Sequence, residues 1–271
     1  MPSTAVAEPF AADTHLAQLL VKWQQPSTRA LRPVGVLSFD GEVYRFSYLS
    51  SVHDLAGFRP LMGFPDLDKK YESAALFTLF KERVLDPSRP DYARYVTELD
   101  LDPERATPWE LLTRSGGESA GDTLQLQPFP RKTSAGWGCR AMVAGVRHLA
   151  LKEVDLGSTR SGRYSAEGLE RLLSDLHAGD ELHVTREIGN TWDPAAALLV
   201  TPTGDAIGYL PNWLARLVEP FTRSDSGRCH AHVERVNPLD AGWHLRVLFD
   251  LEVDEPFEAA YQRLMHGEVL R

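Results

Sequence analysis

The second half of the chain contains the segment Arg186-Glu-Ile-Gly-Asn-Thr-Trp-Asp-Pro194. An apolar strand, a Thr203-Gly-Asp205 turn and the run Ile207-Gly-Tyr-Leu-Pro211 follow it. This order places Trp192 and Asp193 in a loop between two strands. A large aromatic ring beside a carboxylate suits the binding of a flat polar ligand, such as an unpaired nucleobase. The segment therefore predicts a binding site and not a catalytic one.

Strands dominate the rest of the second half, and turn residues separate them. Several short strands with turns between them suggest a small β-barrel, which removes exposed edges by closing on itself. We expect strands at Arg140–Leu149, Glu181–Glu187, Ala196–Thr201, Ala206–Leu210, Arg228–Val236 and His244–Glu252, and helices at Ser165–His177, Asn212–Phe221 and Pro256–Met265.

The first half mixes helices with a hairpin, because Asp40-Gly41 accepts the positive φ of a tight turn between two apolar strands. Two prolines and a run of small and basic residues interrupt the pattern around Pro130, as a connection between domains would. The fold class is therefore α+β, with domains at residues 1–130 and 131–271. In the first half we expect helices at Phe10–Gln24, Tyr71–Leu85, Asp91–Leu101 and Pro108–Arg114, and strands at Val34–Phe39, Val43–Tyr48 and Thr123–Gln127.

Composition excludes several classes of protein. The chain has 271 residues, of which 43% are hydrophobic and 25% charged, and no apolar run approaches the length of a membrane span. The N-terminus lacks the features of a signal peptide, so we expect a cytoplasmic protein. The net charge of −9 argues against a protein that coats nucleic acid by neutralising many phosphates. Any contact with nucleic acid must be local and short.

The segment Val143-Ala-Gly-Val-Arg-His148, together with the two runs quoted first, resembles the HIRAN domain, from about Arg140 to about Glu252. HIRAN domains are small β-barrels with flanking helices, found in DNA-repair and remodelling helicases and in varied bacterial proteins. The better understood ones bind the 3′ end of single-stranded DNA. In this chain residues 150–180 form a longer insertion than the compact family form has.

The resemblance implies a role for each matching position. Arg147 and His148 match a basic and aromatic pair on the first strand of the family, and Trp192 matches its stacking aromatic. Asp193 matches the acidic residue that reads the terminal sugar, and Tyr209 stands where a ligand-facing polar aromatic is expected.

Trp243 is a candidate for a second aromatic wall of the site. A carboxylate such as Asp193 accepts a hydrogen bond from a 3′-hydroxyl and repels a 3′-phosphate, so the implied ligand is a strand end and not an internal stretch. This mode of binding needs few phosphate contacts, which fits an acidic protein.

A series of loose motifs in the first half, from Val34 to Pro128, resembles the N-terminal subdomain of HipA-type kinases. The motifs are Val34-Gly-Val-Leu37, Phe46-x-Tyr48, Arg59-Pro-Leu-Met62, Phe77-Thr-Leu-Phe80, Glu110-Leu-Leu112, Gly116-Gly117 and Gly121-Asp-Thr-Leu-Gln-Leu-Gln-Pro128. In that family the subdomain packs against a catalytic core. This chain offers neither the phosphate-cradling loop nor the catalytic loop of a kinase, so we expect no kinase activity. Gly116-Gly117 is expected to end a helix.

Plainer interpretations stay open for several residues. Trp-Asp-Pro can be a simple turn in which Asp193 caps a local amide and Trp192 covers a barrel end. Arg186 and Asn190 are expected to shape the loop. His230 and His232 share a strand face, but without a third ligand at a telling spacing we expect no metal. We likewise expect no catalytic residues and no cofactor.

Two functional hypotheses follow. In the first, the protein is not an enzyme and recognises the 3′-hydroxyl end of single-stranded DNA, in a role related to DNA repair or to toxin–antitoxin systems. Residues 34–128 then dock a protein partner, either a kinase or another effector. In the second, the chain is a regulatory or antitoxin-like subunit that binds a HipA-type kinase in trans, and the barrel is a platform for proteins.

Overall fold

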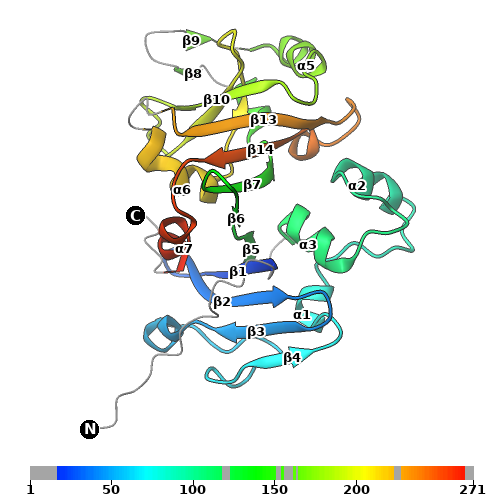
Figure 1. Ribbon diagram of the computed structural model, residues 1–271, viewed down its shortest axis with the longest axis vertical. Helices are drawn as coiled ribbons and strands as arrows, with labels where there is room; N and C mark the ends of the chain where they lie inside the picture. The colour runs from blue at the N-terminus through cyan, green and yellow to red at the C-terminus, as the bar shows by residue number, and fades with distance from the viewer. Residues whose placement is uncertain are drawn as a thin grey trace.

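Two antiparallel sheets form the framework of the molecule. The computed structural model describes residues 17–117, 123–150, 154–155, 161–162, 164–222 and 227–265. The sheets lie one above the other, with α7 (Phe257–Met265) beside their junction and two short helices along the opposite side (Figure 1). None of the helices in the described ranges combines the length and the apolar composition that crossing a membrane requires.

The first sheet has five strands in the order β4-β3-β2-β1-β5. Its hairpin is confirmed, because Phe39 pairs with Tyr44 and the Asp40 carboxylate accepts hydrogen bonds from the next turn amides. The elements are β1 (Ala17–Gln24), β2 (Leu31–Phe39), β3 (Tyr44–Tyr48), η1 (Ser50–Asp54), β4 (Tyr71–Ser73), α1 (Thr78–Lys81), α2 (Tyr92–Glu98), α3 (Pro108–Ser115) and β5 (Leu124–Pro128). The predictions of α2, α3 and β5 are therefore confirmed. Gly116 ends α3 in the left-handed conformation, as expected, and Gly121 lies outside the described residues.

Two predicted helices of the first half are wrong. Residues 17–24 of the predicted helix Phe10–Gln24 form the strand β1, and the rest of that range lies outside the described residues. The central residues of β1 are buried on both faces, and such a strand carries a continuous apolar run that also fits a helical pattern. The predicted helix Tyr71–Leu85 contains only the strand β4 and the four-residue helix α1, with a turn between them.

The second sheet has seven strands in the order β12-β11-β10-β13-β14-β7-β6. Its strands are β6 (Arg131–Lys132), β7 (Trp137–Met142), β10 (Glu181–Arg186), β11 (Ala197–Val200), β12 (Ala206–Tyr209), β13 (Cys229–Val236) and β14 (Val247–Val253). The expected closed barrel is wrong, because this sheet is open. Only an isolated bridge between Ala144 and Tyr209 joins the end of β12 to the chain beyond β7.

The opening has a local cause in the chain after β7. The predicted strand Arg140–Leu149 ends at Met142, Gly145 takes a left-handed conformation with φ of 61°, and the helix α4 (Val146–Leu149) follows. The expected helices of the second half are confirmed as α5 (Ala166–Ser174), α6 (Asn212–Thr222) and α7, and the short 3-10 helix η2 (Trp243–Leu245) precedes β14. The insertion contains α5 and the small hairpin of β8 (Val154–Asp155) and β9 (Ser161–Gly162).

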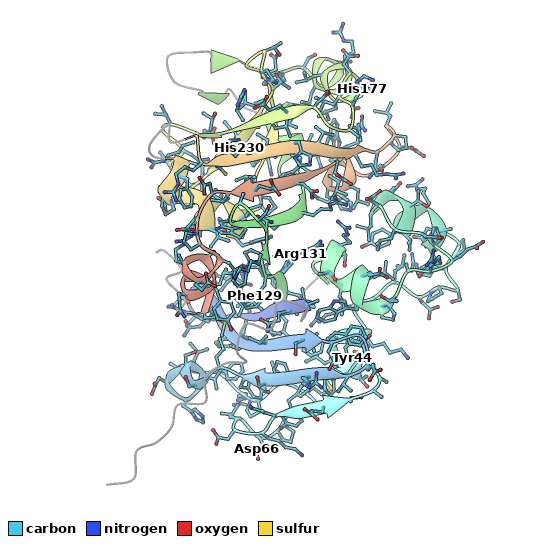
Figure 2. All side chains as sticks on the ribbon, viewed as in Figure 1. Tyr44, Asp66, Phe129, Arg131, His177 and His230 are labelled. Carbon is cyan, nitrogen blue, oxygen red and sulfur yellow. The ribbon has the colours of Figure 1, made fainter. Side chains whose placement is uncertain are left out.

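The chain passes from one sheet to the other at Phe129 and Pro130, between β5 and β6 (Figure 2). The two halves nevertheless share their hydrophobic core. Leu20, Val36 and Phe129 of the first half pack into the core of the second sheet. A second shared cluster joins the helix α2 to Ala241, just before η2, and to Leu245, within η2. The halves therefore form one packed unit.

Polar contacts reinforce this junction. The Asp100 carboxylate, just after α2, pairs with Arg140 and Arg235 of the second sheet. The buried Asn237 side chain donates hydrogen bonds to the carbonyl oxygens of Glu98 and Leu245, at 2.7 and 2.6 Å. Asn237 thus ties α2 to the segment that carries η2.

We predict that Asn237→Ala lowers the free energy of unfolding by about 1–3 kcal/mol, because the substitution leaves two buried carbonyl oxygens without donors. Urea denaturation followed by circular dichroism measures the effect. Glu104→Ala, at an exposed position on the same side of the molecule, is the control and should change stability by less than about 0.5 kcal/mol. Equal stabilities of the two variants would contradict the proposed role of Asn237.

Candidate nucleic-acid interface

The loop between β10 and β11 presents an aromatic ring to solvent. Trp192 is 96% exposed, and Ile188 on the same loop is 58% exposed. The plainer interpretation, in which Trp192 covers a barrel end, is therefore wrong. An exposed indole leaves a π-face free for a flat ligand.

Asn190 shapes this loop. Its Oδ1 accepts hydrogen bonds from the backbone amides of Trp192 and Asp193 at 3.0 and 2.9 Å, and its Nδ2 donates to Glu187. Arg186 donates from Nε to the carbonyl oxygen of Pro194 at 3.0 Å, across the base of the loop. Both residues therefore have the loop-shaping role expected from the sequence. The backbone beneath Trp192 is held by side chains that do not depend on a ligand.

Asp193 is the link between the loop and α6. Its Oδ1 accepts from the Ala195 amide and from Arg216, both at 3.1 Å, and its Oδ2 accepts from Asn212. The plainer interpretation of Asp193 as the cap of a local amide is confirmed in part, since two side chains of α6 also bind it. A carboxylate has about four acceptor positions, so these three bonds leave room for one more donor.

Tyr209 braces the loop from the edge strand β12. Its hydroxyl donates to the buried Glu187 carboxylate at 3.1 Å, and its ring is partly buried against the core of the second sheet. The same carboxylate accepts from Asn190, so β12 and the loop of Trp192 share one acceptor. Tyr209 therefore positions the loop.

Arg147 and His148 lie on the helix α4, so their predicted place on a strand is wrong. Both side chains are exposed. A Cβ atom at Gly145 would lie 2.9 Å from Cδ2 of Tyr209 and 3.5 Å from Cδ2 of His148. The rings of His148 and Tyr209 therefore flank the same glycine, and α4 stands beside β12.

Trp243 belongs to η2, which contacts α4. Its ring is partly buried against the core of the second sheet. The helix α4 thus contacts both η2 and β12, the edge strand of the second sheet. Glu187 joins the loop of Trp192 to β12. Trp243 contributes to this group of elements as a packed wall.

Glu187, Asn212 and Arg216 bind residues of the candidate site, and the sequence reasoning missed them. Asn212 and Arg216 are four residues apart, so they share one face of α6, and a hydrogen bond of 3.2 Å joins them. This spacing is a usable signal. Nothing in the sequence signals that Glu187 is buried beneath the loop.

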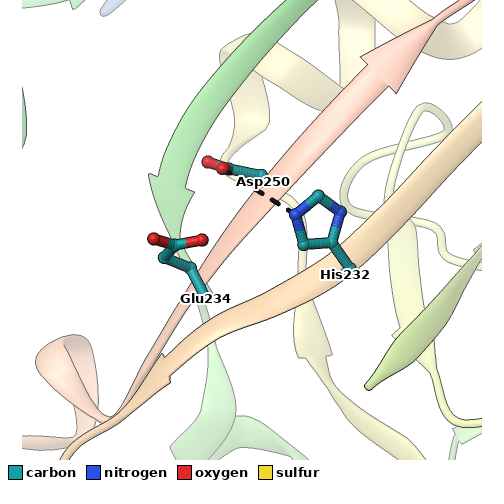
Figure 3. A group of neighbouring side chains, drawn as sticks. All are labelled: His232, Glu234 and Asp250. Carbon is teal, nitrogen blue, oxygen red and sulfur yellow. Dashed lines mark ion pairs between the residues drawn. The ribbon is translucent and has the colours of Figure 1, made fainter. Parts of the chain in front are cut away.

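In the described ranges, one group of side chains has the geometry of a metal site. It consists of His232 and Glu234 on β13 and Asp250 on β14 (Figure 3). Arg140 occupies the acids of this group, with distances of 2.6 Å to Asp250 and 2.8 Å to Glu234. Because the guanidinium already pairs with both carboxylates, the group fits a structural ion-pair network better than a metal site.

Residues 153–254 match the family model of the HIRAN domain. The match supports a HIRAN domain in the second half of this chain. It covers the loop of Trp192, β12 and η2, and it begins after α4, so Arg147 and His148 lie outside it. The expected start near Arg140 is thus earlier than the matched start. Residues 34–128 also lie outside the match, and their resemblance to the HipA-type subdomain stays a prediction.

Two solved structures are similar to part of the chain. The crystal structure of the HIRAN domain of human HLTF is 14% identical, covers 48% of this chain and 87% of its own, and has a TM-score of 0.30. A crystal structure of a protein from Lactobacillus plantarum is 20% identical, covers 42% of this chain and 98% of its own, and has a TM-score of 0.28. No curated protein matches the sequence. Both TM-scores are low, so the assignment rests on the family match.

Position 208, just before Tyr209, has room only for a glycine. Its φ is +153°, and a Cβ atom there would lie 2.3 Å from Cγ1 of Val143. We predict that Gly208→Ala lowers the free energy of unfolding by about 2–4 kcal/mol, through overpacking together with backbone strain. Chemical denaturation measures the loss.

Gly204→Ala is the matched control for this experiment. Gly204 also has a positive φ of +89°, but no atom lies within 4 Å of its Cβ position. It should cost only the strain of about 1–2 kcal/mol. A loss at Gly208 no larger than that at Gly204 would show that close packing on Val143 is not the constraint.

Proposed function

We propose that this protein binds the 3′-hydroxyl end of single-stranded DNA through its HIRAN domain and does so without catalysis. The observation that carries the proposal is the 96% exposure of Trp192 on a loop held by Asn190. HIRAN domains are in general modules that bind the 3′ ends of single strands. A ring held in place before the ligand arrives loses little conformational entropy on binding.

Stacking on Trp192 supplies affinity without reading sequence. The terminal base of a strand has a free face, and stacking on an aromatic side chain contributes about 1–3 kcal/mol per base. The exposed Arg147 and His148 on α4 offer contacts to one or two phosphates. A ligand held in this way suits an acidic protein, since only a short stretch of backbone approaches its surface.

Asp193 accounts for the proposed preference of the protein for a free 3′-hydroxyl. Its pairing with Arg216 offsets the negative charge that would otherwise repel the strand. Its remaining acceptor position can receive the 3′-hydroxyl, which is a donor. A 3′-phosphate carries only acceptors toward this carboxylate, and it would have to displace Asp193 from Arg216.

The absence of catalysis is part of the proposal. Hydrolysis of a strand end needs a metal ion or a base arranged beside a nucleophile. Among the described residues, the single group with metal-ligand geometry is the one whose carboxylates pair with Arg140. Asp193 is likewise held by Arg216 and Asn212. These pairings favour binding over chemistry.

A protein partner on the first half is the second part of the proposal. The second half packs at the β1 and β5 end of the first sheet, while the edge strand β4 lies at the opposite end (Figure 1). Met62 is 81% exposed and belongs to a motif of the HipA-type resemblance. Affinity capture with Met62→Ala beside the unmodified protein tests this surface.

We predict that Trp192→Ala weakens binding of a short single strand with a 3′-hydroxyl by about 5- to 150-fold, the equivalent of about 1–3 kcal/mol of lost stacking. Fluorescence anisotropy with a 5′-labelled oligonucleotide measures Kd. Met62→Ala removes another highly exposed apolar side chain and should leave Kd unchanged. Unaltered affinity of Trp192→Ala, with the fold intact, would rule out the stacking role.

We also predict that the unmodified protein prefers a 3′-hydroxyl strand over a 3′-phosphate strand by about 10-fold or more, because a hydrogen bond to a charged acceptor contributes about 1.5–3 kcal/mol. Asp193→Asn should bring this ratio close to one, since the variant loses the charge and releases Arg216 toward phosphate. Competition titrations with the two oligonucleotides measure the ratio. Equal affinities for both strands in the unmodified protein would refute end recognition.

A further inference from the structure

Two polar side chains are buried on the face of the first sheet that meets the second half. Lys22 on β1 is 7% exposed, and Gln127 on β5 is 2% exposed. Their neighbours on the same face, Leu20 and Phe129, belong to the hydrophobic core that both halves share. Lys22 and Gln127 therefore lie at the junction of the halves and not on an outer surface.

The strand register brings these two side chains together. Leu20 pairs with Gln127 and Lys22 pairs with Gln125, so Lys22 and Gln127 are diagonal neighbours on one face. Diagonal neighbours are about 7–8 Å apart, within reach of two long side chains. Gln125, the strand partner of Lys22, is exposed, so this pair lies near the margin of the junction.

Neither side chain is satisfied within the described part of the chain. Both Nε2 and Oε1 of Gln127 are buried without a hydrogen-bond partner. Lys22 makes no hydrogen bond or ion pair there, and desolvation, followed by the charge of Arg216, lowers its pKa to about 8. Burial of polar groups without partners is costly, and such groups commonly mark the place of a bound ion or water.

Arg216 adds a second cation to this place. Its charge acts on Lys22, and its guanidinium also holds Asp193 at 3.1 Å. An ammonium and an amide N–H group on one sheet face, within range of the charge of a guanidinium, match the needs of an oxyanion. Among the described residues no carboxylate pairs with Lys22, so the charge of its ammonium group is not cancelled there, whereas that of Arg216 is paired with Asp193.

We infer that Lys22 and Gln127 form the core of a binding site for one oxyanion of the phosphate class at the junction of the two halves. The site goes beyond recognition of a strand end, because it does not involve Trp192. Its occupant is either a free phosphate ion or a phosphate group of a nucleic acid. Arg216, whose charge acts on Lys22, also holds Asp193.

Thermal unfolding of the full chain in increasing inorganic phosphate tests the site, with sodium chloride at matched ionic strength as the reference. We expect the Tm to rise by roughly 5 °C when phosphate reaches about 100 times its Kd, because only the folded state binds it. Lys22→Met should abolish this rise. Its Tm in phosphate-free buffer should be at least that of the unmodified protein, since an unpaired buried charge is removed.

Two further variants sharpen the test. Gln127→Leu removes the amide at nearly the same volume and should weaken the response to phosphate, whereas Lys81→Met, at an exposed position, should preserve it. No rise in Tm beyond the chloride reference, or an undiminished rise in Lys22→Met, would overturn the inference. Trp192→Ala should retain the full response, so failure of strand binding and failure of this site are separate results.

Binding of oligonucleotides in phosphate-free buffer identifies the source of the anion. If a strand fills the site, Lys22→Met weakens strand binding and inorganic phosphate competes with the strand. If the occupant is a free ion, Lys22→Met leaves strand affinity unchanged while the response of Tm to phosphate is lost. Both results support the site and assign its occupant.

Discussion

The buried carboxylate of Glu187 is the interaction on which the proposed interface depends. It accepts hydrogen bonds from Tyr209 on β12 and from Asn190 in the loop of Trp192. A buried charged acceptor must find donors, and these two donors come from segments about twenty residues apart. Satisfying Glu187 therefore fixes the loop against the edge strand. Asn190 in turn binds the backbone amides of Trp192 and Asp193, so the exposed indole stands on a rigid base.

The first half of the chain supports this arrangement from beneath. Its α2 is tied by Asn237 to the segment that carries η2 and Trp243. Its strand β1 places Lys22 close to Arg216, the partner of Asp193. The two halves thus meet at more than one place, through apolar contacts and through polar ones. Residues 153–254, which match the HIRAN model, are therefore packed directly against the first half.

Much of this fold follows from local sequence, and the errors have physical causes. The Asp40-Gly41 hairpin and most strands of the second sheet were predictable because turn residues and alternating apolar positions are local signals. β1 was mistaken for a helix because burial on both faces removes the alternation. The strand after Arg140 was extended too far because one left-handed glycine, Gly145, ends it. In the site, Trp192 was recognisable from its loop, whereas Glu187 and Arg216 depend on partners that only the folded chain brings close.

The open second sheet has a consequence for how a strand end can be bound. In a closed barrel, β12 would pair along its length with β7, and its outer edge would be occupied. Here one bridge at Ala144 and Tyr209 holds the edge, and α4 follows it with Arg147 and His148 exposed. Arg147 and His148 on α4 therefore stand beside this edge. In a chain with a net charge of −9, the proposed function requires that a nucleic acid make only a short contact here. A short contact favours a terminal nucleotide, whose base and hydroxyl are both free, over an internal one.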